Sequence, residues 1–546
     1  MNLKNTNTTL SQAAHSQRLK PFCTSTALIR TTVLLILASA TTLASAQTYN
    51  TPLQHVILVI QENRSPDNLF GSNPNFLPGV DIATEGINSL GQHIPLAAVE
   101  MTACYGLSHT HKDWEAMYDN GKMDGADKVI VQDKDNSCPS IPQNPQFKYV
   151  DNGDNRLNPL RGPIDPYFLI AENWGFANYM FHTNQGPSFA AHQFLFSGTS
   201  APSEYGENYY NYFAAEVDGA TGGCLAPANE KTVLIGPDGQ EDVFVYPCFH
   251  HPTLATLLDA AGVSWKYYSQ KAMGIWSAPA ASQDVCQPDQ DHTQCMGQDW
   301  TKNMSIRGVN GASAGQILSD ISTNCNLNNV SWVIPEAAWG DHAHGNKGYG
   351  PSWVADIVNA VATSPCKNPD GSNYWNTTAV LVTWDEWGGW YDHVPPPAVG
   401  YLGGGGNGKQ YVYGFRVPLL VASAYSPYPG YVSGPVSNPL VCPNYYCHDF
   451  GSILNFIEYA FGSNGQSLGT IGNPLWPYAD YYALDAPPSC PTCIYSLADF
   501  FEFNQAPTAP VNIPAPLPAS FFINFTGHHE DADDDDDPTS PSPIAP

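Results

Sequence analysis

Positively charged residues are scarce in this sequence. Its 546 residues include only 21 Lys and Arg against 50 Asp and Glu, which gives a formal net charge of −29 at pH 7. Proteins that bind nucleic acid place clustered Lys and Arg against the phosphate backbone, so this composition argues against nucleic acid as a partner. For the same reason, a phosphate-binding site in this chain would need a metal ion to make it locally positive.

Charged residues of both signs make up only 13% of the chain, whereas Gly and Pro number 46 and 47. Together with 12% aromatic residues, this composition is typical of a rigid, loop-rich globular protein and excludes a disordered one. The length is sufficient to bury one large core or two moderate cores. We find no internal repeat.

Long apolar runs are also rare. The run from Thr31 to Leu43 follows a basic stretch without acids and precedes Ala44-Ser45-Ala46. This order predicts a signal peptide over residues 1–46, and hence a secreted protein, periplasmic or extracellular. The alternative, an uncleaved anchor, is disfavoured because the run is shorter than the roughly 20 residues of a membrane span. No later segment is predicted to span a membrane.

Twelve of the 13 cysteines follow this leader. An even number in an exported chain predicts disulfides, and we favour pairing between sequence neighbours, although spacing alone leaves the connectivity open. The Cys490-Pro491-Thr492-Cys493 stretch could instead be a redox or zinc motif, but a lone pair of this kind is weak evidence.

Buried strands and helices are predicted to alternate along the chain. The strand candidates are apolar, β-branched runs at His55–Ile60, Val330–Ile334, Ala379–Val382 and Val417–Ala422. The helix candidates, by spacing and capping residues, are Thr253–Gly262, Ser352–Val361 and Asp449–Phe461. This alternation predicts an α/β fold with a mostly parallel central sheet flanked by helices, and ligands in such folds bind beyond the carboxyl ends of the strands.

The domain organisation follows from composition. We expect a catalytic domain over 47–486, with disulfide-held insertions or a cap at about 205–303. A Pro-rich appendage is expected over 487–527. The acidic end, 528–546, is predicted to be disordered, with weak calcium collection as an alternative.

Acidic side chains follow two of the predicted strands. Asp385 and Glu386 come directly after an apolar run, where adjacent acids are costly unless a metal ion, a charged substrate or a basic partner compensates them. A solvated surface turn is the alternative, but the flanking tryptophans and the double glycine argue against it. Glu62 and Asn63 follow the first strand and offer hard oxygen ligands.

Ser188 follows Gly186-Pro187 and precedes a helix-like run. Free amides at a helix N-terminus favour an anion such as phosphate, and a metal-bound hydroxyl is easier to activate as a nucleophile. The alternative is an ordinary helix cap. His109, His342 and His393 are candidates to bind a phosphoryl group or protonate a leaving oxygen, although each alone is more often structural.

Several ordered blocks make this chain similar to a known family. The blocks are Glu62-Asn63-Arg64-Ser65, His109 through Asn120-Gly121-Lys122-Met123-Asp124, Gly186-Pro187-Ser188, Val330-Ser331-Trp332 with Asp341-His342, Asp385-Glu386 through His393-Val394-Pro395-Pro396-Pro397, and Phe415-Arg416-Val417-Pro418. Over roughly 53–461 the chain resembles the bacterial phosphoesterases that contain non-haemolytic phospholipases C and related acid phosphatases, within the alkaline phosphatase superfamily.

The resemblance implies an alkaline phosphatase-like fold and a divalent metal ion, with Ca²⁺, Mg²⁺, Mn²⁺ and Zn²⁺ all open. The implied metal ligands are Glu62, Asn63, Ser188 and Asp385, with Glu386 beside them. It also implies Ser188 as the nucleophile, His109 and His342 as phosphoryl-binding or acid groups, and His393 as a further catalytic candidate.

Two departures from the family pattern bear on specificity. Many relatives have Pro-Asn-Arg after the nucleophile, where this chain reads Phe189-Ala190-Ala191-His192-Gln193, and many have His where it has Trp387. We therefore expect a secreted, metal-dependent phospholipase C-like phosphodiesterase whose phosphoester substrate could be a phospholipid. The alternatives are an acid phosphatase and a non-enzymatic metal- or glycan-binding protein on a degenerate hydrolase fold.

Overall fold

The computed structural model describes residues 49–133, 138–153, 162–218, 222–306, 314–402, 410–435, 446–472, 478–486, 490 and 492–525. The expected signal peptide and acidic tail lie outside these residues. Within the described ranges, no helix combines the length and the hydrophobicity needed to cross a bilayer.

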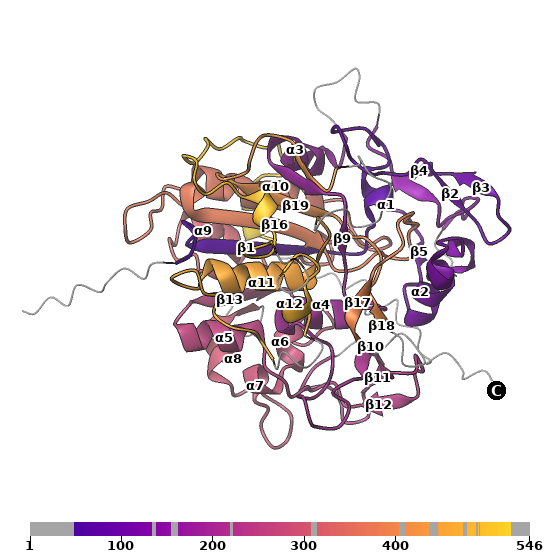
Figure 1. Ribbon diagram of the computed structural model, residues 1–546, viewed down its shortest axis with the longest axis horizontal. Coiled ribbons are helices and arrows are strands. Elements are labelled where there is room, and N and C mark those ends of the chain that lie inside the picture. Colours follow the sequence, from indigo (N-terminus) through magenta and orange to yellow (C-terminus); the bar gives the residue numbers. More distant parts are fainter. Residues whose placement is uncertain are drawn as a thin grey trace, which may run out of the picture. The chain divides into compact units, whose positions relative to one another are not determined.

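An eight-stranded sheet forms the centre of the fold (Figure 1). In spatial order its strands are β14 (Met304–Ile306), β13 (Trp265–Ser269), β15 (Val330–Val333), β1 (His55–Gln61), β16 (Thr378–Trp384), β19 (Leu419–Ser423), β8 (Gly175–Ala177) and β20 (Tyr431–Ser433). All paired neighbours run parallel except those of β19, which is antiparallel to both β16 and β8. The predicted α/β fold with a mostly parallel sheet is confirmed.

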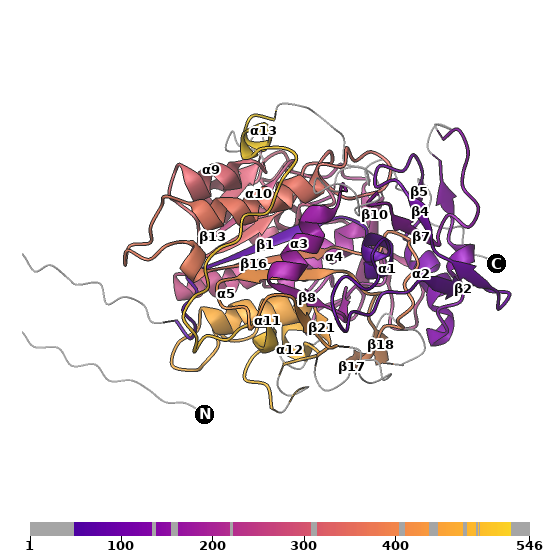
Figure 2. The same ribbon diagram turned by 90° about the horizontal axis from the view of Figure 1, so that it is seen from above.

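Helices cover both faces of this sheet (Figure 2). One face carries α3 (Asp165–Asn173), α9 (Gln316–Ser322) and α10 (Gly350–Thr363), and the other carries α4 (Ser188–Ser197), α5 (Leu254–Ala261) and α11 (Phe450–Ala460). Every residue of β1, β15 and β16 is buried, as a sheet packed on both sides requires.

Two of the three predicted helix starts are confirmed. Thr253 and Asp449 are the N-caps of α5 and α11, and each side chain accepts a hydrogen bond from the main chain three residues on. The prediction that Ser352 begins a helix is wrong, because α10 begins two residues earlier at Gly350 and takes Pro351 into its first turn. The Ser352 hydroxyl instead accepts a hydrogen bond from Leu517 N at 3.4 Å.

The segment between β1 and α3 forms a layer with its own small core. Its elements are α1 (Pro66–Phe70), β2 (Glu85–Ile87), β3 (His93–Pro95), β4 (Ala97–Val99), β5 (Gly106–Leu107), α2 (His111–Tyr118), β6 (Val131–Gln132) and β7 (Lys148–Val150). Leu107 and Trp114 of this layer pack in one apolar cluster with Trp387, Trp390 and Phe415. The layer is thereby attached to the loop that follows β16.

The expected insertion at 205–303 contains a small antiparallel sheet of β10 (Phe213–Asp218), β11 (Lys231–Ile235) and β12 (Val243–Val245). Short helices follow at α6 (Ala278–Ala281), α7 (Gln283–Cys286) and α8 (Gln298–Asn303). The same range also supplies β13 to the central sheet, so it is not peripheral throughout. The remaining elements are β9 (Met180–Phe181), β17 (Ala398–Leu402), β18 (Gln410–Val412), β21 (His448–Asp449), α12 (Ala479–Tyr482) and α13 (Ala519–Ile523).

Disulfides join sequence neighbours, as predicted. The pairs are Cys104–Cys138, Cys224–Cys248, Cys286–Cys295, Cys325–Cys366 and Cys490–Cys493. The last pair takes up both thiols of the Cys490-Pro491-Thr492-Cys493 stretch, so these thiols are not zinc ligands here. Cys447 is also disulfide-bonded, and Cys442 lies outside the described residues.

Candidate functional site

Two neighbouring parallel strands bring the predicted acidic residues together. In the β1–β16 pair, Gln61 lies opposite Trp384, so Glu62 and Asp385 follow at the same level beyond the strand ends. The main-chain nitrogen of Asp385 donates a hydrogen bond to Gln61 O at 2.9 Å. The two strand ends therefore meet at one edge of the sheet.

The Asp385 carboxylate is held in one orientation by main-chain donors. Its Oδ1 atom accepts hydrogen bonds from Asn63 N at 3.0 Å and from Glu386 N at 2.8 Å. Its Oδ2 atom is buried and has no hydrogen-bond partner among the described residues. One oxygen is thus engaged by the protein, and the other is available to a ligand.

The double glycine after β16 permits a close approach of three chain segments. Gly388 has φ +67°, and a Cβ atom there would lie 2.4 Å from Asn63 O. Gly389 has φ +73°, and its Cβ would lie 2.7 Å from Ser108 O. Only glycine fits both conditions, so this pair lets the β16 loop pack against the end of β1 and against the residue before His109.

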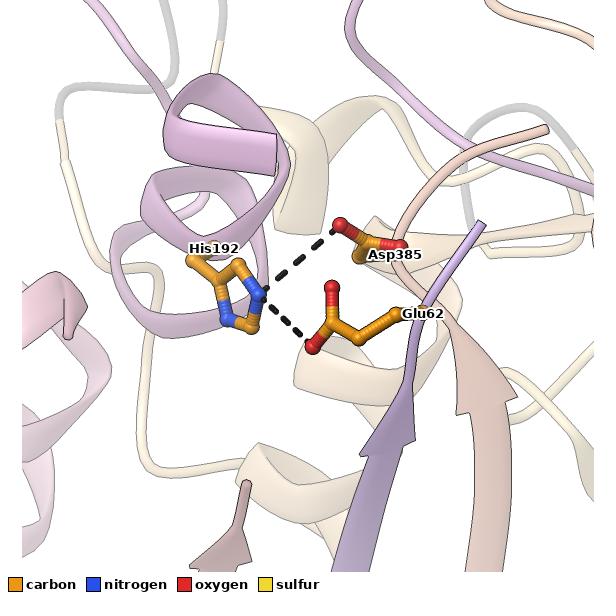
Figure 3. Close-up of side chains that lie close together, drawn as sticks. All are labelled: Glu62, His192 and Asp385. Carbon is orange, nitrogen blue, oxygen red and sulfur yellow. Dashed lines mark ion pairs between the residues drawn. The ribbon is translucent and has the colours of Figure 1, made fainter. Parts of the chain in front are cut away.

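A histidine that the sequence analysis did not assign completes the acidic pair. His192 of α4 points toward Glu62 and Asp385 (Figure 3), with its Nε2 atom 3.5 Å from Glu62 Oε1 and 3.8 Å from Asp385 Oδ2. The exposed fraction is 1% for His192 and 0% for both acids. The three ligand atoms lie within 4.8 Å of one another, a grouping that could hold a metal ion.

Ser188 is the first residue of α4, four residues before His192. Residues four apart share one face of a helix, so both side chains lie on the same side of α4. The Ser188 hydroxyl is buried without a hydrogen-bond partner among the described residues, and so is the side-chain amide of Asn63. Buried polar atoms without partners are costly, and hydroxyl and amide oxygens are ligands that a divalent cation accepts.

Glu386, the last of the predicted metal ligands, is fully buried. Its Oε2 atom accepts a hydrogen bond from Gly388 N at 2.7 Å. This bond connects the carboxylate to the glycine that packs on Asn63.

His109 and His342 lie side by side although they are far apart in the sequence. Their rings are 5.8 Å apart in an edge-to-face arrangement. His109 Nδ1 donates to Leu107 O at 2.9 Å, and His342 Nδ1 donates to Ala343 O. Because Nδ1 of each ring is used in this way, Nε2 is the atom that can exchange a proton with a ligand.

His393 belongs to a different group of charged residues. Its Nδ1 atom lies 2.8 Å from Asp67 Oδ2, and its Nε2 atom lies 3.2 Å from Asp81 Oδ1. Burial lowers the pKa of His393, but the charge of Asp67 and the hydrogen bonds to both acids outweigh it and raise the pKa to about 10. Arg416 also pairs with Asp67 at 3.1 Å and with Asp392 at 2.9 Å, so this cluster already contains its own positive charge.

Trp387, where the chain departs from the family pattern, is fully buried. Its ring stacks on His182 at 5.4 Å and lies edge-on to His109 at 6.4 Å. Burial lowers the pKa of His182 to about 3, so that ring is neutral. Trp387 therefore contacts His182 and His109 as part of a packed aromatic cluster.

Comparison with known proteins supplies the family. The model of the Phosphoesterase family matches residues 53–464. "Phospholipase C B" of Mycobacterium tuberculosis is 25% identical over 489 residues, covering 81% of this chain and 83% of that protein. "Hemolytic phospholipase C" and "Non-hemolytic phospholipase C" of Pseudomonas aeruginosa are each 22% identical over 75% of this chain, and over 53% and 54% of their own lengths. The chain therefore belongs to the phosphoesterase family and is a phospholipase C-type hydrolase of phosphoric esters.

Proposed function

We propose that this protein is a secreted, metal-dependent phosphodiesterase that cleaves phospholipids by the phospholipase C reaction, with Ser188 as its nucleophile. The observation that carries this proposal is the position of Ser188. Ser188 is the first residue of α4, and its hydroxyl is buried. His192 lies on the same face of α4 and points toward Glu62 and Asp385. The phospholipid substrate is supported by the names of the relatives, which are phospholipases C.

In the first step, Ser188 Oγ loses its proton and attacks phosphorus, the bond from phosphorus to the diacylglycerol oxygen breaks, and the phosphorylated headgroup remains on Ser188 as a phosphodiester. A divalent cation bound by Glu62, Asn63, Ser188 and Asp385 would offset charge on the phosphoryl oxygens and favour loss of the serine proton. The free amides of the first turn of α4 add favourable dipoles for the same oxygens.

The histidine pair supplies the proton that the leaving group requires. Nδ1 of both His109 and His342 is engaged by a main-chain carbonyl, so the protonated form of either ring can donate from Nε2 to the leaving alcohol, which for a phospholipid is a diacylglycerol. A water molecule then attacks the phosphorus of this phosphodiester, its hydroxyl leaves with the phosphorylated headgroup, and its proton restores the Ser188 hydroxyl. Without that second step, the reaction would stop after one turnover.

Export is supported by the disulfides. Five pairs are present in the described residues, and such bonds persist in oxidising compartments. We therefore place the protein in the periplasm or outside the cell, after removal of residues 1–46.

The test compares Ser188→Ala with Ser197→Ala. Ser197 ends the same helix, is equally buried and has no hydrogen-bond partner among the described residues, but nine residues of helix turn it to the opposite side of α4. We expect Ser188→Ala and chelation each to abolish release of phosphocholine from phosphatidylcholine, and Ser197→Ala to retain it. Full activity in Ser188→Ala would exclude the covalent route. Faster turnover of p-nitrophenyl phosphate than of phosphatidylcholine would contradict the proposed phosphodiesterase activity and indicate a phosphomonoesterase.

A further inference from the structure

His192 is the buried group that the proposed function leaves without a task. It lies on α4 one turn beyond Ser188, and its Nε2 atom faces a carboxylate from each of two neighbouring strands (Figure 3). We propose that His192 is a direct nitrogen ligand of the metal ion and that it makes the site selective for zinc-like transition metals over Mg²⁺ and Ca²⁺. This inference rests on the proposed metal site and deepens it.

The distances from His192 Nε2 to the two carboxylates distinguish coordination of a shared ion from direct hydrogen bonding. Hydrogen bonds between nitrogen and oxygen measure about 2.7–3.2 Å. The two distances from His192 Nε2, 3.5 Å to Glu62 and 3.8 Å to Asp385, are both longer. Two ligand atoms that share a tetrahedral ion at about 2.1 Å are separated by about 3.4 Å. The spacing is thus that of ligands around one centre.

Charge points the same way. Glu62 and Asp385 bring two carboxylates together in a position that water does not reach. A divalent cation with a neutral imidazole balances both charges, and neutral imidazole is the form that binds metals.

The orientation of Asp385 is consistent with a single bond from this residue to the ion. Asn63 N and Glu386 N both hold its Oδ1 atom, so Oδ2 is the oxygen directed at His192. Main-chain amides cannot rotate away as side chains do. The carboxylate is therefore preorganised to meet the imidazole across an ion.

One nitrogen ligand changes which metal is preferred. Sites made only of carboxylate, amide and hydroxyl oxygens suit Mg²⁺, Ca²⁺ and Mn²⁺, whereas imidazole suits Zn²⁺, Fe²⁺, Ni²⁺ and Cu²⁺. Among the open choices of metal, His192 therefore favours Zn²⁺. Removal of the imidazole should therefore shift the preference of the site toward harder cations such as Mg²⁺ and Ca²⁺.

The test measures metal binding, not turnover. Tag-free protein is titrated calorimetrically with Zn²⁺ and Mg²⁺, and its Cu²⁺ form is examined by pulsed electron paramagnetic resonance for nitrogen of a coordinated imidazole. We expect His192→Gln to bind Zn²⁺ at least about 100-fold more weakly and to lose the imidazole signal, while its Mg²⁺ affinity changes little. Loss of a residue that only hydrogen-bonds to a metal ligand typically weakens binding by about 10–100-fold.

His55→Gln is the matched control, because His55 is a buried histidine at the opposite end of β1, about 20 Å from Glu62. It should leave zinc affinity and the nitrogen signal intact, and thermal unfolding checks that both variants fold. Unchanged zinc affinity and an unchanged imidazole signal in His192→Gln would overturn this inference and leave the proposed function standing. Absence of any metal binding by the unaltered protein would overturn both.

Discussion

The main-chain nitrogen of Asn63 donates a hydrogen bond to Asp385 Oδ1 at 3.0 Å, and this bond joins the ends of two strands that are 322 residues apart in the sequence. Asn63 has φ +61°, the left-handed conformation that asparagine tolerates better than most residues. That turn presents its amide to Asp385 directly after Glu62. The Asp385 carboxylate is therefore oriented by main-chain donors directly beside Glu62.

Gly388→Ala should damage both the fold and the site. A Cβ atom at this position would lie 2.4 Å from Asn63 O, so the β16 loop must move away from the end of β1. We expect the free energy of unfolding to fall by about 3 kcal/mol, and turnover to be lost with the displaced Asp385. Urea unfolding and the phosphatidylcholine assay measure the two effects.

Gly91→Ala is the control for this substitution. Gly91 has a similar φ of +72°, but its Cβ would meet nothing within 4 Å. It should cost only the conformational penalty of about 1 kcal/mol and retain activity. Equal losses in the two variants would mean that the close approach to Asn63 has no importance.

The charge cluster around His393 should make stability depend on alkaline pH. The pKa of His393 is raised to about 10, so its stabilising charge is fully present below about pH 6.5, the ordinary value, and is lost as the pH rises toward 10. With allowance for solvent screening of a ring that is 28% exposed, we expect a loss on the order of 2 kcal/mol across this range. Urea unfolding between pH 6 and 10 measures it.

In His393→Gln this part of the pH dependence should disappear. His93→Gln removes an exposed histidine paired with Glu85 at 2.8 Å and should leave the pH profile as it is, because exposed pairs contribute little. A profile for His393→Gln that parallels the unaltered protein would contradict the assigned role of Asp67 and Asp81.

The strands that carry the site could be predicted because fully buried parallel strands are marked by continuous apolar runs. His55–Ile60 and Ala379–Val382 both correspond to such strands, and the polar residues after each run belong to the candidate site. The antiparallel direction of β19 could not be predicted, since an apolar run carries no information on direction. Ser352 was misplaced because Pro351 is an equally good start signal one residue earlier.

His192 escaped prediction for a physical reason. Every residue of α4 is buried, so no polar face distinguishes a functional histidine from a packed one. Its four-residue spacing from Ser188 is the signal that could have found it. His393, in contrast, was assigned to the site from its sequence neighbours. Its pairing with Asp67 and Asp81, more than 300 residues away, could not be predicted from those neighbours.

Ser433→Ala should retain turnover although Ser433 belongs to an arrangement like that of a serine hydrolase. Its hydroxyl lies 2.8 Å from His448 Nε2, and His448 Nδ1 lies 2.7 Å from Asp485 Oδ2. Burial lowers the pKa of His448, but the charges of Asp499 and Asp485 raise it to about 10, so the ring is protonated and cannot accept the serine proton. We expect a loss of about 1 kcal/mol in stability and unchanged kcat. A folded variant without activity would move the nucleophile from Ser188 to Ser433.

Glu458→Gln should stabilise the protein at neutral and alkaline pH. Glu458 of α11 is fully buried, and burial together with the charge of nearby Asp480 raises its pKa well above the ordinary value. A carboxyl group whose pKa is raised by folding destabilises the native state increasingly as the pH rises above its unfolded pKa, because the unfolded chain ionises freely. Glutamine keeps the shape and removes the ionisation, so the gain should be absent near pH 4 and reach about 1–4 kcal/mol at pH 8. Thermal unfolding at both pH values measures this gain, and Glu502→Gln, which changes an acid in the C-terminal segment, should show no such difference.

A gain that is independent of pH would show that the substitution acts through packing, with no contribution from the charge of Glu458.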